Sequence, residues 1–159
     1  MDCARTTYDH FRLRGEVSIK LPALPRPALD ELQERFSWIK AIEQDTSPEE
    51  SVIFTLATVL HNNEVRIGGE LLMFRLASRL ESLLGYQHFR WILDHGAEYP
   101  EFMALLGKVY IDFPGITVQD ECGIRHFVCY RMGSRNQLNC WCRLDAGFSE
   151  NGRVACVED

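Results

Sequence analysis

The sequence predicts an α+β fold, with an N-terminal half of four or five helices packed on a mainly antiparallel C-terminal sheet. Between residues 27 and 106, apolar side chains recur at intervals of three and four, which is the period of one helical face. Between residues 108 and 157, apolar and polar side chains alternate, which is the period of a strand. The chain has 159 residues, of which 46% are hydrophobic and 25% charged, so we expect one packed core.

Residues 1–26 form a basic leader with several prolines, ahead of the expected single domain at 27–159. The leader carries five arginine and lysine residues against three acids. Residues 16–21 alternate between apolar and polar and predict a possible edge strand. Pro22, Pro25 and Pro27 then predict an extended connection, because proline fixes one backbone angle and restricts the residue before it.

Two helices are expected next along the chain. Apolar residues at helical spacing predict the first helix from Pro27 to about Ile42. Ser47-Pro-Glu-Glu50 is typical of a capping box, so the second helix is predicted from Pro48 to about Leu60, with Ser47 as its N-cap.

Three further helical segments precede the expected sheet. A third helix is predicted over 72–83, between Gly69 and Gly85, and a fourth over 86–95, before Gly96. Residues 100–106 predict one or two additional turns. The core residues expected from these patterns are Leu29, Leu32, Phe36, Ile39, Leu56, Leu72, Leu76, Leu80, Ile92, Leu105, Val109 and Ile111.

The C-terminal part predicts four strands, over 109–113, 124–131, 138–144 and 153–157. Residues 133–136 and 149–152 have the composition of hairpin turns. If residues 132 and 137 flank the first turn, Cys129 lies opposite Cys140, Phe127 opposite Cys142 and Val128 opposite Trp141.

The six cysteines are Cys3, Cys122, Cys129, Cys140, Cys142 and Cys156. We expect Cys129, Cys140 and Cys142 to be reduced core residues, because the chain has enough apolar residues for a core without disulfides. A metal site and a disulfide between Cys129 and Cys140 are the alternatives. No C-x-x-C motif is present, and we expect neither a metal nor a cofactor.

Cys122 and His126 are the weak candidates for catalysis, as a nucleophile and its base in a thiol- or metal-dependent enzyme. Asp120 and Glu121 oppose this hypothesis, because a reactive thiolate needs positive surroundings. The sequence contains no phosphate-binding glycine loop and no nucleophile-elbow motif.

RNA or single-strand binding is a further alternative, through arginine and aromatic residues on the predicted sheet. Aromatic sheet faces can stack bases. The net charge of −6 opposes this function, since nucleic-acid binding requires a basic surface. The residues concerned are Arg125, Arg131, Arg135, Arg143, Arg153, Phe127, Tyr130 and Trp141.

The main charge feature is an acidic stretch, in which seven acids face two bases between residues 27 and 60. With no catalytic motif found, it favours a non-enzymatic protein that binds another protein stoichiometrically, as an inhibitor, immunity-type or adaptor protein. We expect a partner with a basic surface. No apolar run is long enough for a membrane span, and a cytoplasmic location is expected. The predicted binding residues are Asp30, Glu31, Glu34, Trp38, Glu49 and Glu50.

Overall fold

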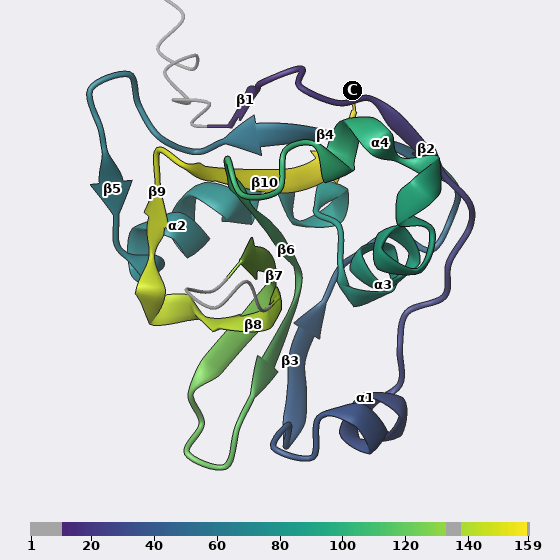
Figure 1. The fold of residues 1–159 in the computed structure, drawn as a ribbon. Helices are drawn as coiled ribbons and strands as arrows, with labels where there is room; N and C mark the ends of the chain where they lie inside the picture. The colour runs from purple at the N-terminus through teal and green to yellow at the C-terminus, as the bar shows by residue number, and fades with distance from the viewer. Residues whose placement is uncertain (1–10, 133–137, 159) are drawn as a thin grey trace, which may run out of the picture.

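The computed structural model describes residues 11–132 and 138–158, which form one large mixed sheet with helices against both of its faces (Figure 1). Its strands follow the order β1-β4-β10-β6-β7-β8, while β2 also pairs with β4 and β3 with β6. The pair β10–β6 is parallel, and the other pairs of this sheet are antiparallel. The strands are β1 (Arg12–Leu13), β2 (Ile19–Leu21), β3 (Ala41–Asp45), β4 (Val52–Thr58), β6 (Tyr110–Gln119), β7 (Arg125–Met132), β8 (Leu138–Arg143) and β10 (Gly152–Val157).

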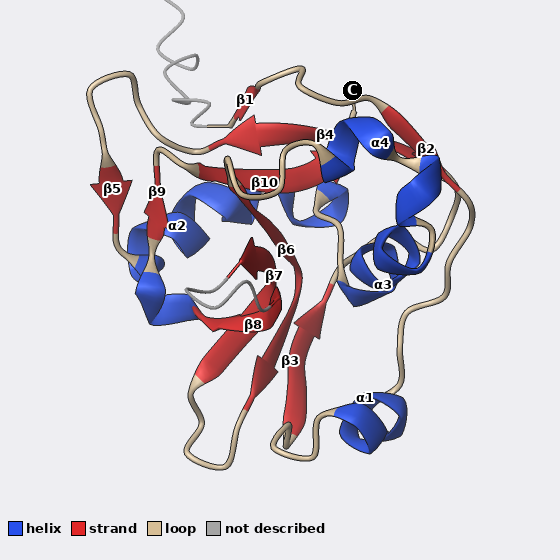
Figure 2. Ribbon diagram, viewed as in Figure 1, coloured by secondary structure: helices blue, strands red, loops and turns tan. Residues whose placement is uncertain are grey.

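A separate two-stranded sheet and a set of short helices complete the described fold (Figure 2). The small sheet pairs β5 (Arg66–Ile67) with β9 (Phe148–Ser149). The α-helices are α1 (Leu29–Arg35), α2 (Gly69–Leu76), α3 (Tyr86–Asp94) and α4 (Pro100–Met103). Short 3-10 helices span Ala77–Ser82, Gly96–Glu98 and Leu144–Ala146.

The predicted division into a helical half followed by a sheet half is wrong. Strands β1 to β5 all lie before residue 68, inside the segment expected to be leader and helices. Strand β4 comes from this N-terminal part and pairs with the C-terminal strand β10 inside the large sheet. Strands from both ends of the chain therefore build one sheet, and α2, α3 and α4 lie between β4 and β6 in the sequence.

The predicted second helix is strand β4. Its sequence VIFTLAT is buried at every position except Ile53, because β4 has neighbouring strands on both edges and a hydrophobic cluster on both faces. A short apolar run of this kind fits a helix or a buried strand equally well by spacing, and its β-branched residues favour the strand. Ser47 caps no helix. Its side chain is buried and bonds Asp45 and Gln87 instead.

The predicted first helix, 27–42, is reduced to the seven residues of α1. Phe36 ends the helix, and Ile42 belongs to β3, where it pairs with Val118. The buried positions Leu32 and Ile39 pack in the same cluster although only Leu32 is helical. The apolar spacing thus identified core residues correctly and their secondary structure only in part.

Two hydrophobic clusters lie against opposite faces of the sheet. Along β4, Phe54 and Leu56 belong to the larger cluster with α3 and α4, and Ala57 to the second cluster with α2. The third and fourth helices are close to their predicted bounds, since α2 with the 3-10 turn spans 69–82 and α3 spans 86–94. Their apolar stripes are long enough to distinguish a helix from a strand.

The four predicted C-terminal strands correspond to β6, β7, β8 and β10. The expected pairs Phe127–Cys142 and Val128–Trp141 are confirmed. A bulge between Val128 and Arg131 shifts the remaining register, so Cys140 does not lie opposite Cys129. The predicted turn at 133–136 lies outside the described residues. The turn at 149–152 joins strands that do not pair with each other, because β9 pairs with β5.

Among the described residues, no helix has the length and apolarity required to cross a membrane.

Candidate functional site

Three of the predicted binding residues are exposed carboxylates on α1, which lies at one end of the molecule beside β3 (Figure 1). Asp30 and Glu31 occupy the first turn, where a negative charge favours the helix dipole. Glu34 lies near the C-terminal end, where the dipole gives it no stabilisation. Among the described residues, none of the three forms an ion pair. We call Asp30, Glu31, Glu34 and Trp38 the acidic surface.

Trp38 follows α1 by three residues and is half-buried, with 36% of its surface exposed. Its ring lies 4.7 Å from that of His126 and 5.8 Å from that of Trp141, measured between ring centroids. Trp141 in turn stacks on Tyr86 of α3. The aromatic cluster therefore holds the Trp38 ring against β7 and β8 while part of the ring faces solvent.

A pocket of about 320 Å³ lies next to Trp38. Its lining includes the carboxylates of Asp120 and Glu121 and the amine of Lys40, whose Nζ lies 3.3 Å from a Glu121 oxygen. The indole ring and the excess of negative charge suit a cationic side chain, since cations are attracted to the faces of aromatic rings. The lining residues are Ser37, Trp38, Lys40, Asp120, Glu121 and Cys122.

The other two predicted binding residues, Glu49 and Glu50, do not lie on a helix. Both are exposed in the connection between β3 and β4. The Glu49 carboxylate accepts a 3.1 Å hydrogen bond from the backbone N–H of Arg26, which precedes α1 by three residues. The structure therefore brings Asp30, Glu31, Glu34 and Trp38 into one segment, and places Glu49 and Glu50 outside that segment.

The candidate catalytic pair lies near the acidic surface, but its groups bond elsewhere. His126 Nε2 is 3.1 Å from Asp120 Oδ2. The other Asp120 oxygen accepts the backbone N–H groups of Cys122 and Ile124. The hydrogen bond from His126 is the main cause that lowers the pKa of Asp120. This network closes the 120–124 turn, and no hydrogen bond joins the exposed Cys122 thiol to His126 in the described structure.

The expectation that Cys129, Cys140 and Cys142 are all reduced is wrong for two of them. Cys129 and Cys142 form a disulfide, with their Cα atoms 6.1 Å apart. The strand register explains why Cys142, and not Cys140, is the disulfide partner of Cys129. Cys142 pairs with Phe127, so Cys129 is its diagonal neighbour on the same face of the sheet. The bulge moves Cys140 into the cluster on the other face. In the described parts of the chain, no group of three potential metal ligands gathers at one point.

The predicted arginine and aromatic sheet face does not form. Phe127 and Tyr130 are buried and belong to clusters on opposite faces of the sheet. The arginines are spread over separate places, since Arg131 pairs with Asp112 and Arg153 with Glu16. Arg125 pairs with glutamates and Arg143 with an aspartate, while Arg135 lies outside the described residues. The described residues of the sheet therefore form no continuous surface for stacking bases.

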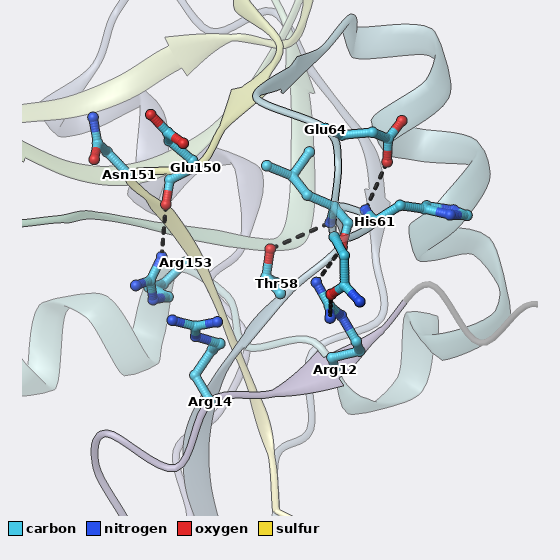
Figure 3. Close-up of a pocket in the computed structure, with 10 residues that line it drawn as sticks. Arg12, Arg14, Thr58, His61, Glu64, Glu150, Asn151 and Arg153 are labelled. Carbon is cyan, nitrogen blue, oxygen red and sulfur yellow. Dashed lines mark hydrogen bonds between the residues drawn. The ribbon is translucent and has the colours of Figure 1, made fainter.

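Sequence reasoning missed a pocket of about 410 Å³ at the end of the sheet where β1, β4 and β10 meet (Figure 3). Arg12 pairs with Thr58 across β1 and β4. The β4–β10 register, continued by one residue, sets Arg153 opposite Thr58 on the other side. Arg14 is two residues from Arg12, so its side chain projects from the same face of the sheet. The only signal for this pocket in the sequence was the positive charge of residues 1–26.

No family model, no curated protein and no solved structure matches this chain.

Proposed function

We propose that this protein binds another protein stoichiometrically and without catalysis, through the acidic surface and the pocket beside Trp38. The observation that carries the proposal is the half-exposed Trp38 ring next to three exposed carboxylates that have no ion-pair partner among the described residues. The partner presents a basic surface with an arginine or lysine side chain that enters the pocket.

Two energetic contributions are expected at such an interface. Unpaired charges mainly increase the rate of encounter and fix the orientation of the partners. Affinity comes mostly from a few well-packed anchors, among which tryptophan is frequent. In this protein, Asp30, Glu31 and Glu34 supply the first contribution and Trp38 the second. Glu49 and Glu50 add negative charge beside the connection that leads to α1.

The thiol-enzyme hypothesis receives less support from the geometry. The His126 imidazole bonds the Asp120 carboxylate, and Cys122 lies on an exposed turn next to Glu121. A nucleophile requires an adjacent base and positive surroundings, and both carboxylates of this turn oppose a thiolate.

The proposal is tested by comparing what three immobilised forms of the protein retain from an extract of the native host. The forms are the wild type, the triple variant Asp30→Lys, Glu31→Lys, Glu34→Lys and a control with the same change in charge. The control reverses Glu81, Glu98 and Glu101, which are exposed on other helical segments and form no ion pair within the described chain.

A protein retained by the wild type and the control, and lost with the acidic-surface variant, is the expected result. Trp38→Ala is then compared with Phe74→Ala, since Phe74 is a 74% exposed aromatic residue on α2. Loss of binding with Trp38→Ala alone supports the anchor role. Equal retention by the wild type and both triple variants contradicts the proposal.

A further inference from the structure

The pocket between β1, β4 and β10 brings three arginines together in a protein whose net charge is −6. Arg12 and Arg14 come from the N-terminal segment and Arg153 from the last strand, so the fold gathers them from opposite ends of the chain. Glu16 balances the charge of Arg153, but neither Arg12 nor Arg14 forms an ion pair within the described chain, so their like charges repel each other unless an anion binds. The pocket lies on strands far from α1, and its role does not depend on the acidic surface.

Two of the guanidinium groups are fixed by protein acceptors. Arg12 donates to the Leu60 carbonyl at 2.7 Å and to the Asn62 side chain. The buried Arg153 donates to Glu16 at 2.6 Å and to the carbonyls of Glu150 and Gly152. These contacts hold the two groups in place before any ligand binds, which reduces the entropy lost on binding.

The third group, Arg14, has no side-chain partner among the described residues. Its backbone N–H bonds the Leu56 carbonyl, which fixes the start of the side chain, and the guanidinium group points into the pocket (Figure 3). The Thr58 hydroxyl accepts the Leu60 N–H at 3.2 Å, so its own proton remains to be donated. Together, Arg14 and Thr58 present hydrogen-bond donors to the pocket between the two fixed arginines.

An anionic group suits these donors, and the rest of the lining indicates what kind of molecule would carry that group. The volume of about 410 Å³ lies in the range of sites for small molecules. No phenylalanine, tyrosine or tryptophan is among the described lining residues, and His61 is the one ring there, so the lining favours a polar ligand with hydroxyl groups over a nucleobase. Glu150 and Asn151 line the pocket and can accept hydrogen bonds from hydroxyl groups. Glu64, also in the lining, is bound to Arg75 by two hydrogen bonds.

We propose that this pocket binds a small phosphate ester with several hydroxyl groups, such as a sugar phosphate. The phosphate oxygens accept hydrogen bonds from Arg12, Arg14 and Thr58, while Arg153 keeps its bonds to Glu16 and to two carbonyls and forms one wall of the pocket. The hydroxyl groups donate to Glu150 and Asn151. Arginine is suited to this role because its planar fork matches the oxygens of phosphate.

Isothermal titration calorimetry at low salt with the full chain tests the proposal. The probes are ribose 5-phosphate, ribose, inorganic phosphate and citrate. We expect one-to-one binding of ribose 5-phosphate, at least tenfold weaker binding of inorganic phosphate and of citrate, and no binding of ribose.

Arg14→Ala is the informative variant, since this exposed side chain supports no other group in the described structure. We expect Arg14→Ala to raise the dissociation constant for ribose 5-phosphate at least tenfold, and Arg14→Lys to raise it by a smaller factor. Lys20→Ala is the matched control, because it removes one positive charge from β2, five residues along β4 from Thr58. Its dissociation constant should stay within twofold of the wild type.

Several results would overturn the proposal. They are no binding of ribose 5-phosphate at millimolar concentration, equal binding of citrate, and equal weakening by Arg14→Ala and Lys20→Ala. Inorganic phosphate that binds as tightly as the ester would overturn the assignment to a phosphate ester.

Discussion

Asp112 is a buried carboxyl group whose replacement should change the pH dependence of stability. It lies in β6, with 1% of its side chain exposed. One oxygen is 3.5 Å from Arg131, and the other has no hydrogen-bond partner among the described residues. Burial raises the pKa of Asp112 from 3.8 to about 7, and Arg131 offsets part of this effect. The Arg131 guanidinium also stacks on Tyr110, 3.9 Å from the ring centroid.

The sign of this pH dependence follows from how tightly the folded and unfolded states bind the proton of Asp112. The folded state holds the proton of Asp112 more tightly than the unfolded state, so this group's contribution to stability is fully present below about pH 4 and is lost as the pH rises through about 7. One pKa unit corresponds to about 1.4 kcal/mol. A shift of this size changes the free energy of unfolding by on the order of 3 kcal/mol between pH 4.5 and 8.5. Asp112→Asn keeps the shape of the side chain and removes this contribution.

Urea unfolding of the wild type and Asp112→Asn across this pH range measures the effect. We expect the stability of the wild type, relative to the variant, to fall by on the order of 3 kcal/mol from pH 4.5 to pH 8.5. The control is Glu81→Gln, which neutralises an exposed carboxylate that forms no ion pair within the described chain and should give a much smaller change over the same pH range. Parallel pH profiles for the wild type and Asp112→Asn would refute the reasoning.

Two further predictions concern the buried hydroxyl group of Ser47 and the reactivity of the cysteines. Ser47→Ala should destabilise the protein by about 1–3 kcal/mol, because the buried hydroxyl donates to Asp45 at 2.5 Å and accepts from Gln87 at 2.9 Å. In the same denaturant assay, Ser51→Ala, whose exposed hydroxyl donates to Leu21, should cost less, and equal costs would contradict a special role for Ser47. When the native protein is treated with iodoacetamide and mapped by mass spectrometry, the exposed Cys122 should react first among the cysteines that the structure describes. Cys140 should react slowly because burial raises its pKa to about 11. Cys129 and Cys142 should react only after reduction, so labelling of either one without a reductant would contradict the disulfide.

Residue spacing predicted the elements that extend over several periods. The α2 and α3 helices and the strands β7, β8 and β10 lie close to their expected positions, because repeated apolar positions distinguish a period of 3.6 from a period of 2. Strand β6 begins where expected but continues through Pro114 and Gly115 to Gln119, six residues beyond its predicted end at Phe113. Residue spacing predicted the wrong secondary structure for much of the chain before residue 68, where the elements are short. The seven residues of β4 satisfy both periods, and pairing with β2 on one edge and with β10, about a hundred residues away, on the other makes them a strand.

Two further features depend on contacts that no local pattern contains. The disulfide partner of Cys129 was set by a bulge in the β7–β8 pair, which a hairpin register with a constant sum cannot include. The arginine pocket depends on β1 and β10 lying on either side of β4. By contrast, Asp30, Glu31, Glu34 and Trp38 were within nine residues of one another, so their grouping could be predicted without the correct fold.

The proposed protein-binding function is tested most directly by association kinetics with the purified partner. The rate constant is measured at several salt concentrations for the wild type, the lysine triple variant of Asp30, Glu31 and Glu34, and the control triple variant of Glu81, Glu98 and Glu101. We expect the acidic-surface variant to associate roughly tenfold more slowly at low salt and to lose most of its salt dependence, while the control stays close to the wild type. An association rate and a salt dependence that are unchanged in the acidic-surface variant would contradict the proposed binding surface.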